Sequence, residues 1–152
     1  MCWHAAHVAV WLAEKQVRLR RAGRRDRSAV LAVLAADPRD RRTRFDRRLF
    51  ADLGADVYVA ETRSGQIVGA LAVCYPRSLA SGRFQAWLDT LRVETGHDEL
   101  LGPMLDFVER RARRRGCREL FASPGLEDSA AGPLLQARGW MPRATLSRAL
   151  GD

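Results

Sequence analysis

The sequence predicts a single α/β domain, in which about four helices flank a mixed, mostly antiparallel sheet of six to seven strands. The chain has 152 residues, the size of one domain, and 47% of them are hydrophobic, which is enough to build a core. Short runs with an apolar residue at every second position alternate with longer runs of helical periodicity. No internal repeat or Gly/Ser-rich linker divides these runs.

The N-terminal part predicts one strand and two helices. Residues 1–16 carry one basic residue and are expected to form an N-terminal extension, for which a short helix is one interpretation. The domain itself is expected to span residues 17–150. A first strand is expected at 17–21, where apolar residues alternate with arginines, and helices are expected at 25–37 and 44–54.

The middle of the chain predicts a β-hairpin and a further strand. Residues 56–61 and 66–75 are strand-like and are separated by a short turn, and Gly69 within the second run indicates a bulge or a close backbone approach. A strand follows at 84–93. Simple alternation places Asp89 on the same face as Leu91 and Val93, so this carboxyl is expected to be half-buried with a raised pKa.

The C-terminal part predicts a long helix at 98–115, which Gly116 ends. Its expected buried positions are Leu101, Met104, Leu105, Val108 and Ala112. Its polar face carries two acid–arginine pairs at a spacing of four, Asp106 with Arg110 and Glu109 with Arg113. A short strand at 117–122, a helix at 128–139 and a last strand region at 140–150 complete the expected order.

Four segments, at 57–73, 87–93, 100–121 and 130–140, together resemble the GCN5-related N-acetyltransferase (GNAT) superfamily. The resemblance covers residues 17–150 and implies a single GNAT-like domain. It also implies acetyl-CoA as co-substrate and transfer of an acetyl group to an amine of a small molecule or a protein. In this family the strands that correspond to 87–93 and 117–122 splay apart, and the cofactor lies between them.

The resemblance also implies which residues hold the cofactor. The backbone around Leu91, Arg92 and Val93 would hold the pantetheine. The start of the long helix would hold the diphosphate, because its first N–H groups lack intrahelical partners. The helix-start residues are Asp98, Glu99, Leu100, Leu101 and Gly102.

The expected diphosphate loop departs from the family pattern of a leading basic residue followed by spaced glycines. The pattern falls on residues 96–101 or, with one residue of slip, on 97–102, where Gly102 alone fits. Asp98 and Glu99 bring negative charge to the helix start, and Pro103 removes one N–H donor.

Two carboxylates are candidates for the general base that deprotonates the acceptor amine, Asp89 within the strand and Glu94 at its end. The position at which many family members carry a tyrosine acid is Leu135. An acetyl-CoA-dependent N-acetyltransferase is therefore the main hypothesis. A catalytically degenerate GNAT-like module for binding or interaction is the alternative.

The net charge of +8 favours anionic ligands without choosing among them. Aromatic residues are not interleaved with the arginines, so a nucleic-acid partner is not expected. No apolar run is long enough to span a bilayer and no signal peptide is evident, so a cytoplasmic protein without a membrane partner is expected. Cys2, His4 and His7 lack a fourth ligand, so no metal site is expected. A homodimer is left open.

Overall fold

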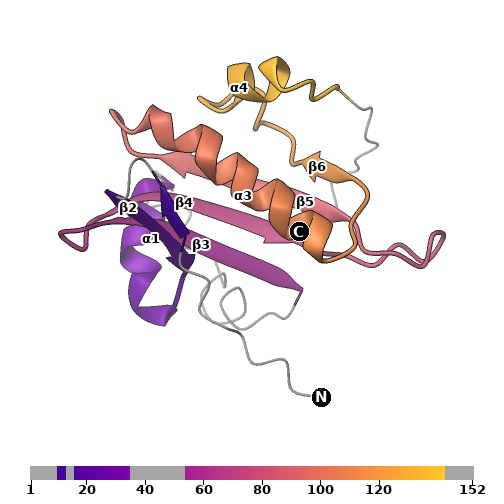
Figure 1. Ribbon diagram of the computed structural model, residues 1–152, viewed down its shortest axis with the longest axis horizontal. Coiled ribbons are helices and arrows are strands. Elements are labelled where there is room, and N and C mark those ends of the chain that lie inside the picture. Colours follow the sequence, from indigo (N-terminus) through magenta and orange to yellow (C-terminus); the bar gives the residue numbers. More distant parts are fainter. Residues whose placement is uncertain (1–9, 13–15, 35–53, 143–152) are drawn as a thin grey trace, which may run out of the picture.

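The computed structural model describes residues 10–12, 16–34 and 54–142, which form a mixed sheet of six strands with helices on both faces (Figure 1). The strands follow one another in chain order, antiparallel from β1 to β5 and parallel between β5 and β6. Their bounds are β1 Val10–Leu12, β2 Val17–Arg21, β3 Ala55–Thr62, β4 Ile67–Cys74, β5 Ala86–Val93 and β6 Leu120–Ala122. The predicted α/β class and the mostly antiparallel sheet are confirmed.

Three α-helices lie within the described residues. They are α1 Arg27–Val33, α3 Leu101–Arg114 and α4 Gly132–Ala137, and 3-10 turns at Arg24–Asp26 and Asp98–Leu100 lead into the first two. Apart from Gly54, the helix expected at 44–54 lies outside the described residues, and so does most of the strand region expected at 140–150. None of the described helices is long and apolar enough to cross a membrane.

The two faces of the sheet bury different helices. On one face α3 packs over β4 and β5, and every residue of its predicted apolar stripe is buried. On the other face Val30 and Val33 of α1 pack against Val59, Ile67 and Ala70. The central strand β4 is buried on both sides, which explains its nearly continuous apolar sequence.

The start of the sheet corrects one expectation. Residues 10–12 of the expected extension form β1, which pairs with β2 through Val10–Leu19, Trp11–Arg18 and Leu12–Val17. A helix is therefore wrong for these three residues, which belong to the sheet although they precede residue 17. Burial of Leu12 in the main core gives the physical reason for the pairing.

The hairpin of β3 and β4 confirms both readings of Gly69. Ala60 pairs with Gly69 and Glu61 with Ile67, so Val68 is an extra residue at a bulge. A Cβ on Gly69 would also lie 3.1 Å from the Cβ of Ala60 and 3.3 Å from the carbonyl oxygen of Arg92. The neighbouring strands therefore leave little room for a side chain here.

The arginines of α3 are used differently from the expectation. Glu109 does pair with Arg113, at 3.5 Å, but Asp106 pairs with Arg138 beyond α4 instead of with Arg110. Arg111 and Arg115 turn toward the sheet and contact the fully buried Asp56 of β3, with N–O distances of 3.2 and 3.1 Å. Part of what looks like a solvated basic face therefore neutralises a buried acid.

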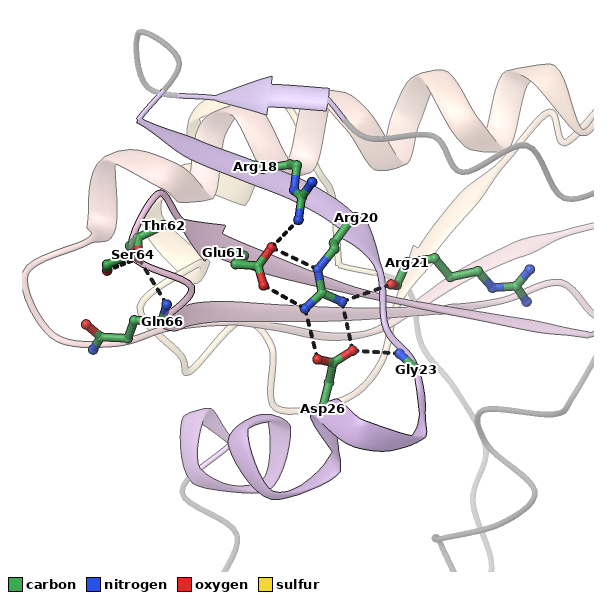
Figure 2. A network of polar contacts seen from close by, with 9 residues as sticks. All are labelled: Arg18, Arg20, Arg21, Gly23, Asp26, Glu61, Thr62, Ser64 and Gln66. Carbon is green, nitrogen blue, oxygen red and sulfur yellow. Dashed lines mark hydrogen bonds and ion pairs between the residues drawn. The ribbon is translucent and has the colours of Figure 1, made fainter.

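A second charged network fixes α1 to the sheet (Figure 2). Arg20 of β2 donates two hydrogen bonds to Asp26, at 2.8 and 2.9 Å, and two to Glu61 of β3, at 3.0 and 2.9 Å. Arg18 adds a contact of 2.5 Å to Glu61. Alternation of arginines with apolar residues is typical of a strand with one solvent-exposed face, but the Arg20 side chain is only 14% exposed, because Asp26 and Glu61 both pair with it.

Candidate active site

The candidate active site is a fork between two parallel strands. β5 and β6 pair only over Ala86–Leu120, Trp87–Phe121 and Leu88–Ala122, and the last bond of this ladder joins the N–H of Ser123 to the carbonyl of Leu88 at 2.9 Å. β5 then continues to Val93 beside β4 alone. Figure 1 shows β6 as a short strand beside the beginning of β5.

The backbone of β5 beyond the fork presents polar groups to the open side. Glu94 donates its N–H to the carbonyl of Val68 in β4 at 2.8 Å. The pairing register places Arg92 and Thr90 two and four positions before it, so their N–H groups also point toward β4. In an antiparallel ladder the intervening residues point the other way. The N–H groups of Leu91 and Val93 therefore face away from β4, into the gap that β6 leaves.

A β-bulge lies at the point where the strands part. Ala72 pairs with Thr90 and Val73 with Leu88, so Asp89 is the extra residue on β5. The bulge shifts the alternation, and Leu88 and Leu91 both enter the same core. Asp89 is exposed, so the expectation of a half-buried carboxyl on the face of Leu91 is wrong. Simple alternation fails because a bulge changes which residues share a face.

Two hydroxyl groups hold the carboxylate of Asp89 at the fork. Thr90 Oγ1 donates to Asp89 Oδ2 at 3.0 Å, and Ser123 Oγ donates to Asp89 Oδ1 at 3.3 Å. Ser123 immediately follows β6, so this contact joins the two diverging strands through their side chains. The sequence gives no signal for Ser123, because its partner is 34 positions away.

Glu94 lies elsewhere on the same strand. It is half-buried at the end of β5, accepts a hydrogen bond from Gln66 Nε2 at 3.2 Å, and lines a cavity of about 630 Å³ beside α1. Asp89 and Glu94 are five positions apart, roughly 16 Å along a strand. The two candidate bases are therefore not brought together, and a single water cannot bridge them.

The loop after β5 turns at Gly96, which has a φ of +88° and precedes a bond of 3.1 Å from the N–H of His97 to the carbonyl of Glu94. Glycine favours this backbone conformation. The side chain of His97 lies 3.6 Å from the Glu99 carboxylate. The loop thus has a tight turn, but its basic side chain already faces an acid.

Only some of the backbone N–H groups expected to bind the diphosphate at the helix start are free to do so. The N–H groups of Leu100 and Leu101 donate to the carbonyls of His97 and Asp98, and both side chains are buried. Asp98 and Glu99 are exposed at the beginning of the 3-10 turn, where N–H groups have no intrahelical partner. Of the expected residues, Leu100 and Leu101 therefore serve the core and the turn in this structure.

The helix α4 closes the core beside the site without bringing an acid to it. Leu135, at the position of the family's tyrosine, is 5% exposed and belongs to the main core. Gly132 packs against the backbone of Glu127 so closely that a Cβ would lie 1.9 Å from its carbonyl oxygen. After α4, Arg138 reaches back to α3, where it pairs with Asp106.

Solved structures with the same arrangement are acetyltransferases in several cases. A ribosomal-protein-alanine N-acetyltransferase from Brucella melitensis shares 19% identity over 90% of this chain and 99% of that chain, with a TM-score of 0.67. An aminoglycoside antibiotic 6′-N-acetyltransferase from Acinetobacter baumannii shares 17% over 90% and 98%, with a TM-score of 0.71. A transcriptional regulator from Bacillus halodurans shares 19% over 88% and 99%, with a TM-score of 0.73.

These similarities establish the fold. The sequence matches no protein-family model and no curated protein. The chain has the GNAT fold that the sequence predicts, and the identities of 17–19% carry no further than the fold.

Proposed function

We propose that the protein is an acetyl-CoA-dependent N-acetyltransferase that transfers the acetyl group directly to an amine. The observation that carries the proposal is the fork, where the N–H groups of Leu91 and Val93 face an opening beside an exposed carboxylate, Asp89. Such an opening accepts the extended amide chain of pantetheine by β-type hydrogen bonds. Acetyl-CoA would supply the acetyl thioester.

In this proposal Asp89 is the general base. Its carboxylate accepts the proton that the amine loses as nitrogen bonds to the acetyl carbon, while Thr90 and Ser123 keep the carboxylate in place. The C–S bond breaks, and water protonates the leaving thiolate, because the acid's position holds the buried Leu135. Glu94 is the second candidate base, set apart at the far end of the strand.

The fit of acetyl-CoA to these residues is good at the fork and poorer at the loop. Leu91 and Val93 suit the pantetheine, with Arg92 between them. The Gly96 turn and the N–H groups of Asp98 and Glu99 suit the diphosphate, and Gly102 leaves the helix surface without a side chain. The exposed carboxylates of Asp98 and Glu99 oppose an anion.

The acceptor is an amine of a small molecule or of a protein. The structures with this fold include one enzyme named for a ribosomal-protein alanine and another named for an aminoglycoside. Their diversity shows that the fold does not select the acceptor.

A binding module that has lost catalysis is the second candidate. Asp98 and Glu99 favour it because they bring negative charge to the helix start, and Leu135 favours it because it stands where the family carries a tyrosine acid. Such a module predicts no turnover with any amine, whether or not acetyl-CoA binds.

Thermal unfolding with increasing acetyl-CoA tests the proposal. At 100 times its dissociation constant the ligand stabilises the folded state by about 2.7 kcal/mol, which raises the midpoint by about 5–11 °C for a chain of this size. No shift at millimolar acetyl-CoA would refute the enzyme. The binding module would be favoured if acetyl-CoA shifts the midpoint but no amine of a panel causes release of the CoA thiol, and if D89N gives the same results as the wild type in both assays.

A further inference from the structure

Arg138 has a position that neither the fold nor the proposed catalysis explains. It follows the last residue of α4, yet its guanidinium pairs with Asp106 on α3. One of its terminal nitrogens lies 3.4 Å from the point where a Cβ on Gly102 would be. The guanidinium therefore rests against the first turn of α3, beside the backbone of Gly102.

This position is close to the start of the helix along its axis. Gly102 is four residues beyond Asp98, where the 3-10 turn begins. At a rise of 1.5–2.0 Å per residue, the separation along the axis is about 6–8 Å. The guanidinium therefore lies little more than one helical turn from the N–H groups at the helix start.

The charges around the helix start indicate a role for this arginine. Asp98 and Glu99 are exposed at the helix start, and His97 lies beside Glu99. An anion at this place meets two carboxylates, and the loop contributes no free cation of its own. Arg138 brings a positive charge from α4 to the same turn, and its hydrogen bond to Asp106 raises the pKa of the guanidinium above its ordinary value.

The present partner of Arg138 is easily exchanged. The two side chains are 30% and 44% exposed, and an exposed ion pair contributes about 0–1 kcal/mol. Loss of the contact to Asp106 therefore costs little. A guanidinium that donates two parallel bonds to phosphate oxygens makes one of the stronger polar contacts in proteins.

We propose that Arg138 binds the diphosphate of the acyl-CoA in place of the basic residue that the loop lacks, by exchanging Asp106 for phosphate oxygens. This inference rests on the proposed function. It assigns a specific side chain, from a different helix, to the part of the cofactor that the loop fits least well. Asp106 then holds the guanidinium near the site when the cofactor is absent.

Calorimetric titration of the wild type, R138Q and D106N with acetyl-CoA and with acetylpantetheine, which lacks the diphosphate, tests the inference. We expect R138Q to weaken acetyl-CoA binding at least tenfold and to leave acetylpantetheine binding unchanged. D106N frees the arginine, so it should bind acetyl-CoA as tightly as the wild type or more tightly. R138K, which keeps the charge but loses the paired donors, should fall between the wild type and R138Q.

Three results would overturn the inference. If R138Q binds acetyl-CoA as well as the wild type does, the arginine does not hold the diphosphate, while the proposed function stands. If R138Q and D106N weaken both ligands equally, the pair is only a tie between α3 and α4. If the wild type binds neither ligand, the proposed function fails and this inference fails with it. Should R138Q not fold, D106N and R138K still test the inference, because D106N is expected to keep or raise the affinity for acetyl-CoA and R138K to lower it.

Discussion

Replacement of Asp56 by asparagine should be among the most damaging conservative changes in this protein. The carboxylate is fully buried and lies 3.1–3.4 Å from nitrogens of Arg21, Arg111 and Arg115, and it accepts a bond of 3.3 Å from the Tyr58 hydroxyl. Asparagine keeps the shape and can still accept from Tyr58. It removes the negative charge and leaves three guanidinium groups around a neutral amide.

The magnitude follows from the burial of the partners. Removal of one member of a buried ion pair costs about 3–5 kcal/mol. The arginines are 28–38% exposed, so water can solvate them and the lower end applies. We expect D56N to lower the free energy of unfolding by about 3 kcal/mol, which corresponds to a drop of about 6–12 °C in the midpoint of a chain of this size.

Urea denaturation followed by circular dichroism measures this loss. The matched control is E109Q, which removes a carboxylate from a pair on the exposed side of α3 with an N–O distance of 3.5 Å. The control should cost no more than about 0.5 kcal/mol, as exposed pairs at this helical spacing do. If D56N and E109Q cost the same, the buried network does not hold β3 to α3 and the reasoning is refuted.

Three further changes test other parts of the structure. Arg20 lowers the pKa of Glu61 from 4.5 to about 2, so this group stabilises the fold above pH 4.5 and loses that effect as the pH falls toward 2. The unfolding free energy of E61Q should therefore fall less steeply than that of the wild type over this range. G132A should lower the unfolding midpoint by several degrees, because the new Cβ would lie 1.9 Å from a carbonyl oxygen. S123A should lower kcat more than acetyl-CoA affinity, because it removes one of two hydroxyls that orient Asp89.

Each of these predictions has a result that contradicts it. If the unfolding free energies of E61Q and the wild type depend equally on pH, Arg20 does not lower the pKa of Glu61. An unchanged midpoint for G132A would mean that the backbone beside α4 moves at little cost. If S123A leaves kcat unchanged, or if S123T does not restore it, Ser123 does not position Asp89.

The sequence predicted well wherever the local pattern and the environment agree. The apolar stripe of α3 has a regular spacing, and all five of its predicted residues are buried. The hairpin of β3 and β4 has strand patterns on both sides of a short turn. In both cases neighbouring residues determine the outcome, because periodicity alone decides which side faces the core.

The same kind of reasoning failed for β5. A period of two places Asp89 with Leu91, but the extra residue at the bulge moves the carboxylate to an exposed position. A bulge depends on how one strand pairs with the next, so the sequence of β5 alone carries little signal for it. The extension at residues 10–12 is similar, because its strand exists only through pairing with β2.

By itself, the sequence determined the fold class, the core of α3 and the chemical weakness of the loop at Asp98 and Glu99, since these depend on residue type and spacing. Only the tertiary structure decided where the fork opens, which hydroxyls hold Asp89, and that Arg138 reaches the first turn of α3. The contacts of Ser123 with Asp89 and of Arg138 with Asp106 join residues more than 30 positions apart. Such partners are chosen by the packing of whole elements, which no local pattern specifies.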